Sequence, residues 1–313
     1  MTSAGKNELA GWKAVRVALH VFLAYASVPL FAVAAVDAEG SGDQVVSTET
    51  SPSGVEVDIV VPHKESKDST ADTVARSDYE AGKSRLQAGD FDRAIELLRA
   101  ASTEAPQRMD IRLSLGKAYE AAGRLDEAIE TYTDVARRAQ PDSEEARIAS
   151  LNERYAIATR YARSGEVGKA LPIFESLAAE NPDNALLIYS VGVAYMVSGS
   201  LIDAERAFRK VLTLDQGYLR AYLNLSEIYK AKGDFQGAID ELREVVARDP
   251  QGPVGRKASV DLRVIEGRLL SQQGNLADAL NVYREGLALE PENPELLFLS
   301  ANLYRRLDHP AEL

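Results

Sequence analysis

The sequence predicts an all-α chain built from repeated pairs of helices, and three observations support this. Six glycines recur at intervals of 34, 42, 34, 34 and 41 residues: Gly89, Gly123, Gly165, Gly199, Gly233 and Gly274. An alanine follows each glycine by five residues, and a small residue (Gly, Ala or Ser) precedes each by seven. Small side chains at two fixed places in every period indicate helices that cross at close range. Each unit is therefore predicted to be a helix, a glycine turn, a helix and a second turn.

The same alignment sets the repeat boundaries. Prolines lie seventeen residues after four of the glycines, where proline can end the second helix of a pair. The predicted repeats are about 75–108, 109–142, 143–184, 185–218, 219–252 and 253–293, with a terminal helix at 294–307. The extra residues of the third repeat, Ser143 to Ser150, suit a helix and are predicted to lengthen its first helix to about 33 Å. Those of the sixth, Pro253 to Ser259, contain Pro and Gly and are predicted to form a loop.

The pattern resembles the tetratricopeptide repeat over residues 75 to about 307. The glycine and alanine positions carry the resemblance, together with an aromatic residue four before the glycine, as at Tyr119 and Tyr229. Arg85 and Leu270 replace that aromatic residue in two repeats, and Gly286 is an unusual choice inside a second helix. The resemblance implies a right-handed α-solenoid of helix pairs, whose concave groove is lined by the first helix of each pair.

Residues 1–36 are predicted to be a signal peptide or a membrane anchor. Lys6, Lys13 and Arg16 precede an almost wholly apolar stretch at 17–36, which is typical of the charged and apolar regions of a signal peptide. Small residues around Ala34 suit cleavage by a signal peptidase. The apolar stretch is also long enough to span a bilayer, so a retained membrane tether through residues 17–36 is the alternative. Either way, the rest of the chain is predicted to be exported to the periplasm or cell envelope.

Residues 37–74 are predicted to form a flexible, acidic linker rich in Ser, Thr and Gly. Inside the linker, residues 55–61 alternate as a half-buried strand does. A single strand is not stable by itself. It therefore pairs with the sheet edge of a partner, packs on the helical domain, or stays without regular structure.

The composition of the chain excludes several classes of protein. There is no Cys, which removes disulfides, thiolate nucleophiles and thiolate zinc sites. The three His residues are His20, His63 and His309, so residues 64–308 lack the commonest acid–base and metal-binding side chain. A formal net charge of −12 and a pI near 4.9 argue against nucleic-acid binding. We therefore expect no catalytic residues, no metal site and no cofactor.

The resemblance implies that a protein partner binds the outward positions of the first helices. The predicted partner-binding residues are Tyr155, Leu186, Tyr189, Val193, Met196, Leu223, Asn224, Glu227 and Arg268. Leu186, Tyr189, Val193 and Met196 share one helical stripe, separate from the stripe that packs in the core. A helix that is apolar on two stripes is either buried between layers or offers a binding strip.

The sequence as a whole predicts a non-catalytic scaffold of the cell envelope that binds an extended or helical segment of a partner. The alternative is a membrane-tethered structural component of an envelope export or polysaccharide secretion assembly. The terminal helix carries the apolar run Leu296 to Leu299, although the last unit of a solenoid needs a polar outer face. The cover is the short segment after it, a second copy forming a homo-oligomer, or a partner.

Overall fold

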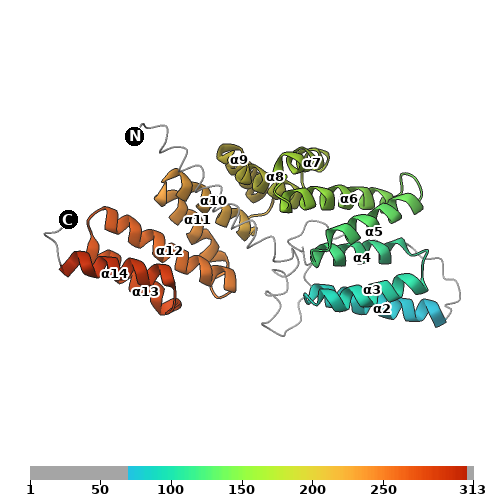
Figure 1. The fold of residues 1–313 in the computed structure, drawn as a ribbon, viewed down its shortest axis with the longest axis horizontal. Coiled ribbons are helices and arrows are strands. Elements are labelled where there is room, and N and C mark those ends of the chain that lie inside the picture. The colour runs from blue at the N-terminus through green and yellow to red at the C-terminus, as the bar shows by residue number, and fades with distance from the viewer. Residues whose placement is uncertain (1–69, 309–313) are drawn as a thin grey trace. The chain divides into compact units, whose positions relative to one another are not determined.

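The computed structural model describes residues 70–308, with side chains from Thr73 to Leu307. Within this range every regular element is an α-helix, and there are thirteen, α2 to α14 (Figure 1). The predicted signal or anchor segment, most of the linker and the candidate strand at 55–61 lie outside the described residues. Helix α2 begins at Thr70, five residues before the predicted start of the repeats. None of the described helices is both long and apolar enough to cross a bilayer.

The chain divides into two compact units between Ala204 and Glu205, inside α9. Unit 1 contains α2 (Thr70–Gln87), α3 (Phe91–Glu104), α4 (Met109–Ala121), α5 (Leu125–Arg138), α6 (Glu144–Arg163), α7 (Val167–Glu180), α8 (Ala185–Val197) and the start of α9 (Leu201–Leu214). Unit 2 contains the rest of α9, α10 (Leu219–Lys232), α11 (Phe235–Arg248), α12 (Pro253–Gln272), α13 (Leu276–Leu289) and α14 (Pro294–Asp308). The even-numbered helices are the first helices of the repeats.

The six repeating glycines lie at the turns between paired helices, as predicted. All six have positive φ angles, between 75° and 84°. At the end of α10, for example, Gly233 adopts the left-handed conformation and its N–H bonds to the carbonyls of Tyr229 and Lys230. A side chain with a Cβ is strained in this conformation, so glycine fixes the point at which each first helix ends.

The small residues seven positions before these glycines lie where the two helices of a pair cross. A Cβ added to Gly116 of α4 would lie 2.4 Å from the Tyr132 ring of α5. In unit 2, a Cβ added to Gly267 of α12 would lie 2.2 Å from the Tyr283 ring of α13. The close helix crossing that the sequence predicted is therefore confirmed in both units.

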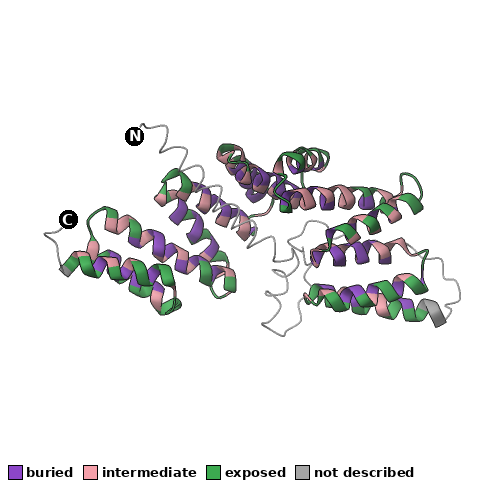
Figure 2. Ribbon diagram, in the orientation of Figure 1, coloured by how far each residue is buried: buried purple, intermediate pink, exposed green. Residues whose placement is uncertain are grey.

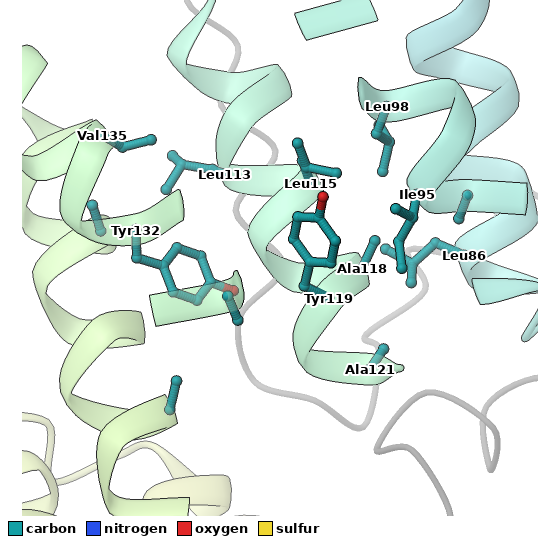
Figure 3. Packing of buried hydrophobic residues seen from close by; sticks show 14 of the residues in the cluster. Leu86, Ile95, Leu98, Leu113, Leu115, Ala118, Tyr119, Ala121, Tyr132 and Val135 are labelled. Atoms are coloured by element: carbon teal, nitrogen blue, oxygen red, sulfur yellow. The ribbon is translucent and has the colours of Figure 1, made fainter. Parts of the chain in front are cut away.

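Each unit has its own hydrophobic core between its helices, and buried residues line the facing sides of the ribbons (Figure 2). In unit 1, Leu98 of α3 and Tyr132 of α5 are fully buried and pack with Leu113 and Tyr119 of α4 (Figure 3). Consecutive helices pack on one another from α2 to α8 and from α10 to α14, and in unit 1 α4 also contacts the first helices α2 and α6. This pattern of neighbour contacts is that of a solenoid.

A recurring hydrogen bond joins the second helix of one repeat to the first helix of the next. Its members are twenty residues apart: Arg99 with Tyr119, Glu175 with Tyr195, Arg209 with Tyr229, and Arg284 with Tyr304. In the first three pairs the tyrosine is the aromatic residue four before a repeating glycine, whereas Asp308 follows Tyr304 at that distance. In all four pairs the tyrosine hydroxyl is the bonded atom. The tyrosine thus packs against its own repeat and ties it to the previous one.

The two extra segments are both helical, so one prediction is confirmed and one is wrong. Helix α6 is lengthened to 20 residues, beginning at Glu144 with Ser143 as its cap. Residues 253–259 were predicted to form a loop, but they are the start of α12. Pro253 occupies the first turn, where its missing N–H is not needed. Gly255 lets the helix pass the end of α11, because a Cβ there would lie 1.6 Å from the carbonyl oxygen of Asp249.

Candidate functional site

The first helices of unit 1 are linked side by side through polar contacts. The Ser114 hydroxyl on α4 lies 3.5 Å from the Tyr79 hydroxyl on α2, and the Tyr155 hydroxyl on α6 lies 3.4 Å from the Ser190 hydroxyl on α8. We call the residues along this row the first-helix surface of unit 1. It comprises the partly exposed residues Tyr79, Lys83, Ser114, Lys117, Glu120, Leu186, Tyr189 and Val193.

At the end of this surface formed by α2 and α4, two cations lie against Tyr79, and each also pairs with a carboxylate: Lys83 with Glu80 and Arg108 with Asp110. The Lys83 ammonium lies 5.3 Å from the centre of the Tyr79 ring, and the Arg108 guanidinium lies 5.5 Å from it. A ring face attracts cations, so the Tyr79 ring stabilises both positive charges over its faces. Arg108 also forms a two-bond ion pair with Asp110 at 2.5 and 2.8 Å.

The middle of the surface contains two ionisable groups whose charge is disfavoured. Burial raises the pKa of Glu120 to about 7, although the Tyr132 hydroxyl, 3.1 Å away, and the charge of Lys117 favour the carboxylate. Burial also lowers the pKa of Lys117, with Glu120 opposing and Lys83 adding to that effect. Partial burial without full pairing is costly for a charge, so both groups gain from a partner that supplies hydrogen bonds.

The predicted binding residues of α8 differ in their exposure. Leu186, Tyr189 and Val193 are partly exposed, whereas Met196 is only 5% exposed. Helix α8 has no charged residue along its whole length. Three side chains of the predicted stripe therefore offer apolar surface on this helix, and Met196 packs beneath it.

Tyr155 belongs to the core of unit 1 rather than to its exposed surface. It is 9% exposed, and its ring makes an edge contact with Phe174, with centroids 5.7 Å apart. Burial raises the pKa of Tyr155 to about 12, and the negative charge of Glu120 adds to the increase. The ring therefore forms a rigid floor between α6 and α8.

The predicted binding residues of unit 2 lie in a surface of paired charges. Leu223 and Glu227 of α10 are partly exposed, while Asn224 is 5% exposed. Glu227 forms an ion pair with Lys230. Arg268 of α12 is exposed and pairs with Glu295 of α14 at 2.5 Å. The charges of Glu227 and Arg268 are thus already paired within the chain.

Asp261 is the least compensated charge in this part of unit 2. It lies on α12, and burial raises the pKa of its carboxyl. The positive charges of Lys257 and Lys230 oppose that effect, while Glu227 adds to it. Within the described part of the chain, no group of three or more His, Asp or Glu side chains could hold a metal ion.

Glu120 is the residue of this surface that sequence reasoning missed. It lies one helical turn after Lys117 on α4, so the spacing of the two places them on the same stripe. That spacing was a signal of a shared surface. It gave no sign that the carboxylate is buried, because the covering groups come from α5 and α6.

Comparison with proteins of known sequence relates the chain to bacterial and human proteins. It is 24% identical over 196 residues to the TPR repeat-containing protein YpiA of Bacillus subtilis, covering 63% of this chain and 43% of that protein. It is 26% identical over 170 residues to lipopolysaccharide assembly protein B of Escherichia coli K12, covering 51% and 42%. The human protein O-mannosyl-transferase TMTC1 is 26% identical over 183 residues, 58% of this chain and 19% of that protein. The chain thus spans less than half the length of each relative.

Solved structures with a similar fold include two that align over most of the described helices. The APC/C hetero-tetramer Cut9-Hcn1 aligns with a TM-score of 0.55 and 17% identity, covering 73% of this chain and 42% of that one. The type IV pilus biogenesis factor PilW aligns with a TM-score of 0.54 and 17% identity, covering 72% and 98%. Family models described as tetratricopeptide repeat match residues 79–144, 155–218 and 196–258, and one described as TPR repeat matches 267–308. The chain is a member of the tetratricopeptide repeat family.

Proposed function

We propose that this protein is a non-catalytic scaffold of the cell envelope, which binds a segment of a partner protein on the first-helix surface of unit 1. Proteins of the tetratricopeptide repeat family mediate contacts between proteins, and the observation that carries the proposal is the character of α8. This helix has no charged residue, yet Leu186, Tyr189 and Val193 are partly exposed. Apolar surface of this kind is typical of a protein-binding site.

The energetics favour a short amphipathic or extended segment as the ligand. Covering a Leu, Tyr or Val side chain completely contributes about 1.5–3 kcal/mol relative to leaving it in water, and here each is already partly covered. Leu186 packs against the core cluster that contains Tyr155, and Met196 at the end of the stripe is buried, so the surface loses little entropy when a ligand binds. The three apolar residues of α8 thus supply affinity on a rigid support.

Polar groups on α4, in the same row of first helices, supply specificity. Lys117 and Glu120 are partly buried, and burial disfavours the charged form of each. A ligand that donates to the carboxylate and accepts from the ammonium would relieve that cost. A ligand lacking such groups would bury both charges further, which weakens its binding.

The proposal that the protein is non-catalytic rests on the residue types that the chain contains. The chain has no Cys, and no His between residues 64 and 308, so no thiol or imidazole is available for acid–base or nucleophilic chemistry there. One relative is named as a mannosyl-transferase, and the match covers 19% of its length. The repeats alone therefore give no reason to assign transferase activity to this chain.

The envelope location is supported by the apolar stretch at residues 17–36 and by the names of two similar proteins. One is a lipopolysaccharide assembly protein and the other a pilus biogenesis factor. The second candidate is a membrane-tethered component of an export or polysaccharide secretion assembly, which the length of that same stretch favours. Mass spectrometry of the mature N-terminus separates the two, since cleavage near Ala34 excludes the tether.

The binding site can be tested by site-specific cross-linking, because the chain has no Cys of its own. A photoreactive group attached to Val193→Cys is expected to form an adduct with one partner of constant mass in envelope extracts. The matched control is Ala179→Cys, an exposed position on the second helix α7. Adding Tyr189→Asp to Val193→Cys is expected to lower the adduct yield at least about ten-fold, because the charge would be buried at the interface.

Two results would contradict the proposal. Equal labelling from Val193→Cys and Ala179→Cys would show that the α8 strip makes no specific contact. Turnover of a substrate by the purified protein, abolished by a single substitution in unit 1, would show that the protein is an enzyme.

A further inference from the structure

Lys117 carries an uncompensated positive charge at the centre of the first-helix surface of unit 1. Helix α4 contacts both α2 and α6, so Lys117 lies inside the row of first helices and not at its end. Its ammonium forms no ion pair with any described residue, whereas Lys83 of α2 has a carboxylate 3.7 Å away. Glu227 and Lys230 of α10 are three residues apart and form an ion pair. Lys117 and Glu120 have the same spacing in the opposite order and form none, so Lys117 is the lysine of this surface that lacks a carboxylate.

Glu120 does not neutralise Lys117 at every pH, because burial favours the protonated form of its carboxyl. Burial raises the pKa of this carboxyl to about 7. The Tyr132 hydroxyl of α5 donates to Oε2 at 3.1 Å, and the charges of Lys117 and Arg163 also favour the carboxylate, but burial outweighs them. With this pKa, about nine-tenths of the carboxyls are protonated at pH 6 and about one-tenth at pH 8. The charge next to Lys117 therefore changes close to neutral pH.

The helices packed against α4 surround this pair with cations and tyrosines. The groups that act on Lys117 or Glu120, or respond to their charge, are Lys83 of α2, Tyr132 of α5, and Tyr155 and Arg163 of α6. Arg163 lies at the end of α4, where its guanidinium is 2.9 Å from the position of a Cβ on Gly123. Helix α3 contributes Arg99, which bonds to the Tyr119 hydroxyl of α4 at 2.7 Å. Apart from Glu120 these groups are positive or neutral, so a negative charge on a ligand is attracted to this site.

Building on the proposed function of the same surface, we propose that the bound segment places an acidic side chain against Lys117, and that a proton on Glu120 switches this binding on. Tyr132 engages Oε2, so the proton lies on Oε1, from which the neutral carboxyl donates to the carboxylate of the ligand. The Lys117 ammonium donates a second hydrogen bond. The proton thus replaces a donor from the ligand at Glu120. Without the proton, Glu120 is a negative charge beside the carboxylate of the ligand and repels it, so the ligand binds one protonation state better, as a switch requires.

The position of Lys117 selects an acidic side chain within the segment over other groups. A segment that covers Tyr189 of α8 and continues over α6 to Tyr79 of α2 passes Lys117 with its middle, because α4 lies between α2 and α6. A basic side chain at that point would be repelled by Lys117 and Arg163. An apolar side chain would bury the ammonium further without pairing it, which is costly for a charge.

A synthetic peptide tests the switch on the full chain. The probe is the tightest-binding sequence from a displayed library of random 12-residue peptides without His, selected at pH 6 and synthesised with an acetylated N-terminus and an amidated C-terminus. Its sequence is expected to contain Asp or Glu. Replacing that residue with Asn or Gln is expected to weaken binding about ten-fold or more at pH 6, because a charge-assisted hydrogen bond is lost.

The pH profile separates a switch from a simple ion pair. The dissociation constant of the peptide is expected to rise about ten-fold from pH 6 to pH 8, since the protonated fraction of Glu120 falls by about that factor. Glu120→Gln, which stays neutral, is expected to bind at pH 8 nearly as tightly as the wild type does at pH 6. Lys117→Met is expected to bind the acidic peptide and its amide variant equally weakly, and Lys210→Met, at an exposed lysine on the second helix α9, is expected to change nothing. Circular dichroism checks folding at both pH values.

Three outcomes would overturn the switch and leave the proposed function intact, provided that Tyr189→Asp weakens binding of the peptide. The first is a dissociation constant that is equal at pH 6 and pH 8. The second is full pH dependence in Glu120→Gln, which would assign the titration to Lys117. The third is an acidic residue of the peptide that can be replaced without loss of affinity. A peptide that is indifferent to Tyr189→Asp, or a library that yields no binder, would count against the proposed function itself and the switch with it.

Discussion

The two units of this protein share one way of packing helices but differ in the surface that their first helices present. Gly116 against Tyr132 in unit 1 and Gly267 against Tyr283 in unit 2 are the same contact in two places. The surfaces are unlike: unit 1 has the uncharged helix α8 and the incompletely paired Glu120, whereas unit 2 has ion pairs such as Arg268 with Glu295.

This difference shows that the core positions and the surface positions of a repeat protein can vary independently of one another. The residues that face the second helix repeat with the period of the fold, because each pair must close at the same distance. The other stripe of the first helix is free to vary from one repeat to the next. On α10 and α12 of unit 2, Glu227 and Arg268 are paired within the chain, whereas α4 and α8 of unit 1 carry Glu120, whose charge is disfavoured by burial, and apolar surface that a partner can cover.

The largest expected effect tests the part that the units share. Gly116→Val and Gly267→Val each force a side chain into a tyrosine ring, so each is expected to lower the free energy of unfolding by about 2–4 kcal/mol. Urea denaturation followed by circular dichroism measures the change. The control is Gly168→Ala on α7, where an added Cβ meets nothing within 4 Å and no loss is expected. A loss from only one valine variant would show that the two contacts are not equivalent.

The second prediction concerns the pH dependence of the free energy of unfolding, which Glu120 of unit 1 is expected to produce. Glu120 has a pKa near 7 in the folded protein against an ordinary value of 4.5, so the folded state keeps the proton to higher pH. The contribution of Glu120 to the free energy of unfolding is fully present below about pH 4.5 and is lost as the pH rises through 7. The free energy of unfolding is expected to fall by about 1–3 kcal/mol between pH 5 and pH 8.

The same denaturation series in Glu120→Gln checks this assignment. The variant is expected to lose the part of the pH dependence that Glu120 contributes, because its amide does not ionise, while the raised pKa values of Glu241 and Asp261 leave a remaining dependence. No His lies between residues 64 and 308, so no imidazole in the helical units obscures the result. An unchanged slope in the variant would show that another group titrates.

A smaller effect is expected from the ion pair that contains Glu241, the buried carboxylate of unit 2. Arg209 bonds to Glu241, which is only 6% exposed and whose pKa is raised by burial. Arg209→Met leaves the carboxyl unpaired and is expected to lower the free energy of unfolding by about 1–2 kcal/mol at pH 7. Adding Glu241→Leu to Arg209→Met is expected to recover most of the loss, which a merely local packing defect would not allow.

The smallest effect concerns the exposed ion pair. Arg268→Ala removes the partner of Glu295, but the two side chains are 46% and 51% exposed. Water screens such a pair, so the change in the free energy of unfolding is expected to stay within about 0.5 kcal/mol. A loss well above that value would place Arg268 in a more important structural role and would weaken the contrast with unit 1.

Features that depend on contacts within one helix pair were predicted correctly from the sequence, and features that depend on contacts with other segments were not. The glycine turns and the small crossing residues were predicted, because both depend on contacts inside one helix pair. Residues 253–259 were predicted wrongly, because Gly255 is a packing residue beside Asp249 and not a helix breaker.

The predicted partner-binding residues show the same limit. The helical stripe on α8 could be assigned from spacing alone, but spacing did not separate Val193, which is partly exposed, from Met196, which is buried. Exposure depends on neighbouring helices, whose approach is not encoded in the stripe itself. For the same reason the sequence did not single out Glu120.

The sequence by itself determined the helix pairs, their turns and their order, because glycine conformation and helix crossing are local properties that recur with the period of the repeat. It also determined the absence of Cys, and of His from residues 64–308. The tertiary structure alone decided which polar groups are buried and which apolar side chains remain in water, since desolvation depends on every element that packs around a group. The burial of Glu120 and the exposure of apolar side chains on α14 are therefore consequences of the fold and not of the local sequence.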